Sequence, residues 1–277
     1  MPRRFRQIDV FTDVPYTGNP VAVVLDGDGL DDDAMRRFAN WTHLSETTFV
    51  LPPTTAEADY RVRIFTTATE LPFAGHPTLG TCHAWLEAGG TPRRSDVTVQ
   101  ECAAGLVPIR RTPAGLAFAA PPLRRSGPVD HALVAEITGA FGLEPAVVLA
   151  AEWVDNGPGW LALLLPSADD VLATRAGFVD QCIGLVGPHP PGSPHAVEVR
   201  AFVPDAAAMT EDPVTGSLNA SLAQWLTATG RVAAPYTASQ GTVLGRAGRV
   251  HVEKIDDIVW VGGDAATTIK GVVGLGA

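Results

Sequence analysis

Two stretches of the sequence, VRIFTTATELPFAGHPTLGT at 62–81 and EVRAFVPDAAAMTEDPVTGSLNA at 198–220, share one pattern. Each contains an Arg-x-Phe triplet in a strand-like segment, and a proline follows eleven or twelve residues after the Phe. The residue before that proline is His76 in the first copy and Asp212 in the second. The proline is followed in both copies by two variable residues, then a glycine, and then Thr or Ser. This self-similarity indicates two copies of a strand, a loop and a helix.

The helix of each copy is predicted from apolar residues at helical spacing. These are Leu79, Cys82 and Leu86 in the first copy and Leu218, Leu222, Trp225 and Leu226 in the second. Each pattern runs into glycine, at 89–90 and at 230, where a helix would end. Further helices are expected at 31–41 and 129–141. Segments rich in Val, Ile and Phe predict strands at 8–11, 21–25, 47–51, 61–65, 160–165, 197–203, 250–255 and 259–261.

The length and the Pro/Gly distribution predict two domains. The chain has 277 residues, and its segment 112–128 is rich in Pro and Gly, which is typical of a crossing between domains. We therefore expect a first domain at 1–115, to which 265–277 returns, and a second domain at 116–264. A similar Pro/Gly run at 187–194 is interpreted as a loop.

Composition narrows the class of partner. The formal net charge is −10 and no dense Lys/Arg run occurs, so nucleic acid is not expected as a partner. No stretch approaches the roughly 20 apolar residues of a membrane helix, and the three cysteines have no ligand spacing, so a soluble cytoplasmic protein without a structural metal is expected. The sequence contains no Walker A, G-x-S-x-G or H-E-x-x-H motif, and no G-x-G-x-x-G between a predicted strand and helix. No cofactor is therefore predicted.

The two helix starts suggest a chemistry. The first N–H groups of a helix lack intrahelical partners and lie at its positive end, so they suit a substrate carboxylate or a developing enolate. If the two copies face each other, His76 and Asp212 approach one cleft. The alternative is that Asp212 is an ordinary N-cap and His76 a loop histidine.

Glu46 precedes an apolar strand pattern at 47–51. Partial burial there would raise the pKa of its carboxyl and allow it to take and return a proton near neutral pH. The residue alone reads more simply as a solvated strand end, because Glu is rarely buried.

Several stretches together resemble the PhzF-like (phenazine biosynthesis-type) family of the diaminopimelate epimerase superfamily. They are QIDVFTDVPYTGNPVAVV (7–24), HLSETTFVLPP (43–53), the two stretches quoted first, SQGTVLGRAGRV (239–250) and VWVGG (259–263). The resemblance implies an α/β (α+β) fold of two similar domains, each a curved mixed β-sheet wrapped around a central helix, with the active site in the cleft between them.

The resemblance also assigns roles to residues. Glu46 would be the acid/base, with His76 and Asp212 assisting it. Backbone groups of Gly75, Gly216 and Ser217 would bind the acidic end of a small-molecule substrate, and Asn19 would be a further substrate-binding residue. Members of the family are often homodimers, so a homodimer is expected as well.

Three functions are weighed. The first is a cofactor-independent isomerase that shifts a double bond on a small carboxylate-bearing metabolite of antibiotic or other secondary metabolism. The second is an epimerase or racemase acting at one carbon with Glu46 and either His76 or Asp212. The third is a non-catalytic metabolite-binding relative. The two-thiol epimerisation of the superfamily is disfavoured, because Cys82, Cys102 and Cys182 lie outside both loop motifs.

Overall fold

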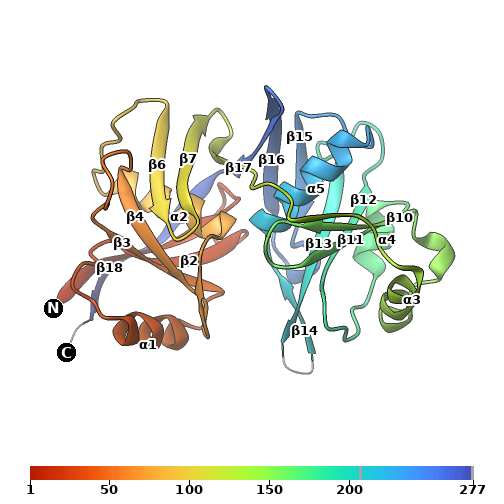
Figure 1. The fold of residues 1–277 in the computed structure, drawn as a ribbon, viewed down its shortest axis with the longest axis horizontal. Helices are drawn as coiled ribbons and strands as arrows, with labels where there is room; N and C mark the ends of the chain where they lie inside the picture. Colours follow the sequence, from red (N-terminus) through yellow and green to blue (C-terminus); the bar gives the residue numbers. More distant parts are fainter. Residues whose placement is uncertain (206–207, 276–277) are drawn as a thin grey trace. The chain divides into compact units, whose positions relative to one another are not determined.

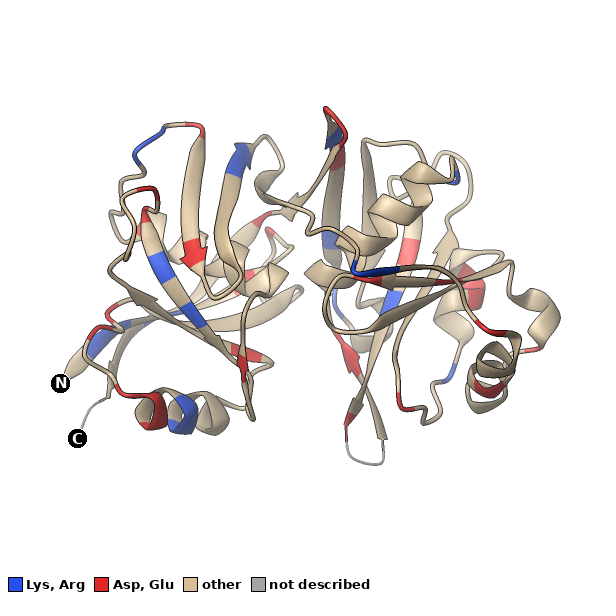
Figure 2. Cartoon of the chain, viewed as in Figure 1, with Lys and Arg blue, Asp and Glu red and all other residues tan. Residues whose placement is uncertain are grey.

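The chain folds into two compact units (Figure 1). In the computed structural model, which describes residues 1–205 and 208–275, unit 1 comprises Met1–Ala119 and Gly262–Ala277, and unit 2 comprises Ala120–Val261. The boundaries expected from the sequence, 115/116 and 264/265, lie four and three residues from these positions. Lys and Arg are dispersed over the strands and loops of each unit, with Asp and Glu among them (Figure 2).

Unit 1 is a curved mixed sheet around one buried helix. Its elements are β1 (Pro2–Val10), β2 (Asn19–Val24), α1 (Asp32–Thr42), β3 (Glu46–Leu51), β4 (Tyr60–Phe65), β5 (Glu70–Leu71), α2 (Gly75–Glu87), β6 (Val97–Cys102), β7 (Gly105–Thr112), β8 (Gly115–Ala119) and β18 (Ala265–Gly274). Helix α2 contacts β1, β2, β3, β6, β8 and β18, so the sheet surrounds it. Small residues permit this approach, because a Cβ at Gly80 would overlap with Val10 and Val21.

Unit 2 has the same plan around helix α5. Its elements are β9 (Arg125–Pro128), α3 (His131–Ala140), the short 3-10 helix η1 (Pro145–Val147), β10 (Ala150–Asp155), β11 (Trp160–Leu164), α4 (Ala168–Ala173), β12 (Cys182–Pro188), β13 (Val197–Asp205), β14 (Ala208–Asp212), α5 (Gly216–Ala228), β15 (Tyr236–Gln240), η2 (Thr242–Leu244), β16 (Gly248–Ile255) and β17 (Ile258–Gly263), which runs across the second boundary. Most of α5 is buried, as in α2.

The order of elements and their pairing are duplicated. The series β1-β2-α1-β3-β4-β5-α2-β6-β7 in unit 1 corresponds to β10-β11-α4-β12-β13-β14-α5-β15-β16 in unit 2. In both series the first two strands are antiparallel, the next pair is parallel, two antiparallel pairs follow, and the strand after the buried helix joins in parallel. The predicted repeat and fold class are confirmed.

The predicted alignment of the two copies is wrong, however. Helices α2 and α5 begin at Gly75 and Gly216, so ELPFAG (70–75) corresponds to EDPVTG (211–216). His76 therefore corresponds to Ser217 and not to Asp212. The hairpin preceding the loop is longer in unit 2, and this shift hides the true register from a comparison made at the prolines.

Two smaller expectations also need correction. The segment 112–128 is not a plain connection, because it contains strands β8 and β9. The helix expected at 129–141 begins at His131, because the Asp130 side chain accepts a hydrogen bond from the Ala132 N–H and so acts as the N-cap. Among the helices of the described residues, none has the length and apolar character needed to cross a membrane.

Candidate active site

Glu46 and His76 meet inside unit 1. Glu46 is the first residue of β3 and His76 the second residue of α2, and the parallel pairing of β3 with β2 brings this strand end beside the helix start. His76 Nε2 lies 3.2 Å from Glu46 Oε2, and the side chains are 5% and 15% exposed. The pair is thus largely removed from water, which excludes the solvated strand-end interpretation of Glu46.

Burial determines the protonation state of His76. It lowers the pKa of the imidazole to about 3, while a hydrogen bond with the Pro20 backbone acts in the opposite direction. His76 is therefore neutral at neutral pH, and its contact with Glu46 is not an ion pair. A neutral imidazole carries one N–H and one lone pair, and the N–H is used in the hydrogen bond to the Pro20 backbone. The ring nitrogen that faces Glu46 therefore carries the lone pair and can accept from a carboxylic acid.

Asn19 and Gly75 complete the group of predicted site residues in unit 1. Asn19 begins β2 and is fully buried, and its Nδ2 lies 3.5 Å from His76 Nδ1. Gly75 is the first residue of α2, preceded by the N-cap Ala74, whose methyl side chain cannot accept a hydrogen bond. The structure thus brings Asn19, Glu46, Gly75 and His76 together.

Asp212 lies at the end of β14 and not at the start of a helix. The N-cap of α5 is Thr215, so the alternative that Asp212 is an ordinary N-cap is wrong. Thr215 Oγ1 donates a hydrogen bond to Asp212 Oδ2, and Gln240 Nε2 donates to the Asp212 carbonyl at 3.1 Å. Gln240, which the sequence analysis did not single out, thereby holds this loop.

Gly216 and Ser217 form the first turn of α5. Trp160 Nε1 donates to Ser217 Oγ at 3.0 Å, and Asn156 Nδ2 donates to the Ser217 carbonyl at 2.8 Å. Neither Trp160 nor Asn156 was predicted at the site, because the only signal at Trp160 was the start of a strand. Asp212, Gly216 and Ser217 are thus grouped within unit 2.

The cysteines do not offer a second reactive centre. Cys82 and Cys102 are buried in unit 1, and burial raises the pKa of both thiols, that of Cys82 to about 12. Among residues 1–205 and 208–275 no cluster of three His, Cys, Asp or Glu side chains is placed to hold a metal ion. The ionisable groups best placed for chemistry in unit 1 are therefore Glu46 and its neighbour His76.

Comparison with known proteins identifies the family of the chain. The sequence matches the phenazine biosynthesis-like (PhzC-PhzF) family over residues 8–271, and the chain belongs to this family. Antisense-enhancing sequence 1 of Schizosaccharomyces pombe is 36% identical, with 96% of this chain and 97% of the relative covered. Trans-2,3-dihydro-3-hydroxyanthranilate isomerase of Pseudomonas fluorescens is 34% identical, with 86% of each covered.

Solved structures share the fold over its whole length. A Pseudomonas aeruginosa protein described as a "Predicted Epimerase" superposes with a TM-score of 0.79 at 27% identity, covering 98% of this chain and 99% of the other. A hydroxyproline epimerase from Agrobacterium vitis reaches a TM-score of 0.59 at 14% identity, covering 98% and 92%, which shows the fold alone. The family thus groups with proteins named isomerases and epimerases.

Proposed function

We propose that this protein is a cofactor-independent isomerase that moves a proton on a small, carboxylate-bearing metabolite, with Glu46 as the acid/base. The observation that carries the proposal is the buried contact between Glu46 and the neutral His76. A general acid/base has to be held in position by its neighbours, and the buried His76 imidazole, with its Nε2 3.2 Å from Glu46 Oε2, is such a neighbour. The relatives named trans-2,3-dihydro-3-hydroxyanthranilate isomerase support this reaction class.

In the proposed reaction the Glu46 carboxylate accepts a proton from a carbon next to a double bond. The electron pair of the broken C–H bond moves into the conjugated system, and Glu46 returns the proton to a different carbon. No atom is gained or lost, so the reaction needs no co-reactant. Asn19 and His76 would keep the Glu46 side chain oriented during both transfers.

We also propose that residues of unit 2 take part in the same reaction. Asp212 would hold a polar substituent of the substrate, and the N–H groups at Gly216 and Ser217 would bind its carboxylate. The hydrogen bonds from Trp160 and Asn156 to Ser217 support this assignment, because they fix the orientation of the first turn of α5. The family description supports a place in secondary metabolism. The homodimer and the cytoplasmic location stay predictions.

Solvent-isotope exchange tests the proposed reaction. The protein is incubated in D₂O with trans-2,3-dihydro-3-hydroxyanthranilate, and deuterium is located in the product by mass spectrometry and NMR. We expect deuterium at the carbon that receives the proton, together with a displaced double bond. No exchange with this compound, nor with a panel of cyclic amino and hydroxy acids, would refute the proposal.

Epimerisation at a single carbon is the second candidate, favoured by the likeness to the protein described as an epimerase. The same experiment separates the two. An epimerase would place deuterium on the carbon that lost the proton and invert its configuration, and the double bonds would stay where they were. Chiral chromatography of the product therefore decides between them.

A further inference from the structure

An arginine–glutamate pair recurs at the same place in both units, and we call each pair an Arg–Glu clamp. In unit 1, Arg63 Nε and Nη2 donate to the two carboxylate oxygens of Glu70 at 2.7 and 2.6 Å. In unit 2, Arg200 Nε and Nη2 donate to the two oxygens of Glu211 at 3.0 and 2.7 Å. Both clamps are bidentate, which fixes the direction as well as the length of the contact.

The surroundings of the two clamps match. Glu70 lies opposite Phe65 across the β4–β5 pair, and Glu211 lies opposite Phe202 across the β13–β14 pair. The guanidinium carbon is 5.0 Å from the ring centroid of Phe65 in unit 1 and 4.9 Å from that of Phe202 in unit 2. The geometry is therefore duplicated although the hairpins differ in length.

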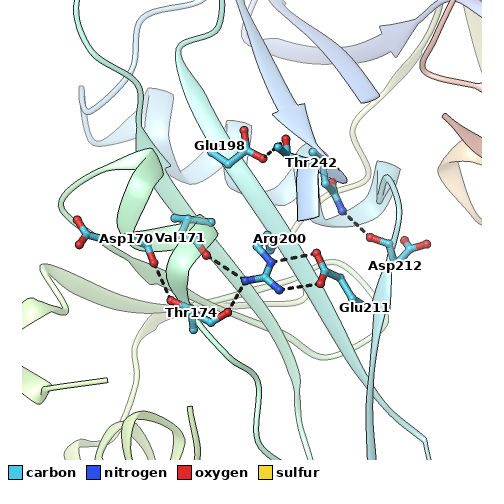
Figure 3. Close-up of polar contacts among 9 residues, drawn as sticks. Asp170, Val171, Thr174, Glu198, Arg200, Glu211, Asp212 and Thr242 are labelled. Atoms are coloured by element: carbon cyan, nitrogen blue, oxygen red, sulfur yellow. Dashed lines mark hydrogen bonds and ion pairs between the residues drawn. The ribbon is translucent and has the colours of Figure 1, made fainter. Parts of the chain in front are cut away.

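Each clamp also holds a preceding helix. Arg63 Nη1 donates to Asp32, the first residue of α1, at 2.6 Å. Arg200 Nη1 donates to the carbonyls of Val171 in α4 and of its C-cap Thr174 (Figure 3). One guanidinium in each unit thus joins a helix, a strand and the beginning of the loop that leads to the buried helix.

The loop after each clamp carries the proposed site residues. Gly75 lies five positions after Glu70, and Gly216 lies five positions after Glu211. A glutamine also holds the segment after each clamp. Gln240 Oε1 accepts from the N–H of Thr215, the N-cap of α5, at 3.0 Å, and Gln100 Nε2 donates at 2.9 Å to Thr78 Oγ1, which lies in the first turn of α2. Side chains therefore fix the start of each loop and the beginning of the helix that follows it.

Stability alone does not explain such pairs. The side chains of Arg200 and Glu211 are 5% and 10% exposed, and those of Arg63 and Glu70 are 23% and 29% exposed. Burying two charges costs about as much solvation energy as their attraction returns, and an ion pair nearer the surface contributes little. What a buried bidentate pair supplies is a defined geometry. We propose that the two Arg–Glu clamps are positioning elements of the reaction, which set the first turns of α2 and α5 so that His76, Asp212 and Ser217 lie where the chemistry needs them. This inference rests on the proposed function.

The test replaces both members of a clamp by apolar residues of similar size. Arg200→Met/Glu211→Met leaves no unpaired buried charge, so the protein can still fold. We expect kcat/KM for deuterium exchange into trans-2,3-dihydro-3-hydroxyanthranilate to fall about 10- to 100-fold, because a misplacement of about 1 Å is enough for such a loss. Arg63→Met/Glu70→Met should behave in the same way.

The matched control is Arg6→Met/Glu87→Met. Arg6 Nε is 3.4 Å from Glu87 Oε2, and Glu87 ends α2 about 16 Å along the helix from His76. We expect this control to keep kcat/KM within twofold. A folded clamp variant with parental kcat/KM would overturn the inference. If the double variants do not fold, Arg200→Lys replaces them, since it keeps the charge and loses the fork; parental kcat/KM would again overturn the inference.

Amide hydrogen exchange distinguishes failure of this inference from failure of the proposed function. In Arg200→Met/Glu211→Met we expect faster exchange at 211–219 and unchanged exchange at 70–78, with the reverse for Arg63→Met/Glu70→Met. This measurement needs no substrate. Unchanged exchange in both loops would refute the clamps as positioning elements even if the parent protein is an isomerase.

Discussion

Units 1 and 2 share one scaffold and differ in the residues at its chemically important points. Strand β3 begins with Glu46, whereas its counterpart β12 begins with Cys182. The second residue of the buried helix is His76 in one unit and Ser217 in the other. The two units thus offer equivalent positions for a side chain at the start of the strand and of the buried helix. The residue that occupies each of these positions differs between the units.

This difference bears on the choice between one and two acid/base groups. Burial, together with the nearby Asp155 carboxylate, raises the pKa of the Cys182 thiol to about 11. The thiol therefore stays protonated at neutral pH and is a poor base. The comparison favours a reaction in which one group of unit 1, Glu46, both takes and returns the proton.

The largest effect is expected for Glu46→Gln. The amide keeps the shape of the side chain but cannot accept a proton, so we expect deuterium incorporation to fall about 10²- to 10⁴-fold. Glu57→Gln, at an exposed position of the same unit, is the control and should leave the rate unchanged. Undiminished deuterium exchange in Glu46→Gln would show that Glu46 is not the base. The main functional difference that we infer between the two units would then no longer hold.

A smaller effect is expected for the free energy of unfolding in acid. It sharpens the comparison of the two units because Ser217, the counterpart of His76 in unit 2, has no group that titrates between pH 3 and 7. The folded-state pKa of His76 is about 3, below its ordinary value of about 6.5, so between these pH values the unfolded chain binds a proton that the folded chain does not. The free energy of unfolding therefore has its full value, as far as His76 is concerned, above about pH 6.5. It decreases as the pH falls below that value, by at most about 1.4 kcal/mol per pH unit.

Urea unfolding of His76→Gln between pH 4 and 7 measures this contribution. The variant should lose less stability than the parent as the pH falls, whereas His131→Gln, at an exposed position, should follow the parent curve. Parallel curves for His76→Gln and the parent would contradict the buried neutral state of this histidine.

The smallest effect is expected for Cys182→Ala. Because the thiol is protonated at neutral pH, its removal should change kcat/KM by less than about twofold. A loss of more than tenfold, with unchanged thermal unfolding, would assign a reactive group to each unit and would favour the single-carbon epimerase over the isomerase.

Much of the fold could be predicted from the sequence. The apolar periodicity located both buried helices, and the Arg-x-Phe repeat indicated the duplication. The alignment within the repeat could not be predicted, because Arg63 and Glu70 are seven residues apart while Arg200 and Glu211 are eleven apart. The equivalence of the two Arg–Glu clamps becomes visible in the strand pairing, where each Glu lies opposite a Phe of the neighbouring strand.

The candidate site was predictable only in part. His76 was suggested by the internal repeat and the role of Glu46 by the family resemblance. Their contact depends on strand pairing and helix packing over a separation of thirty residues. Gln240 and Trp160 were missed, because a polar or aromatic residue in a strand carries no sign of the hydrogen bond that its side chain will make.

The route of the chain has a consequence for its biosynthesis. Strand β18 pairs with β1 along nearly its whole length, and these strands lie on either side of unit 2 in the sequence. During synthesis on the ribosome, β1 therefore cannot pair with β18 until all of unit 2 has emerged. Unit 2 is continuous in sequence and can complete its own sheet before that. The sheet of unit 1 is then completed only after unit 2 has been made, and until β18 pairs with it one edge of β1 is unpaired, which is the kind of edge on which chains aggregate.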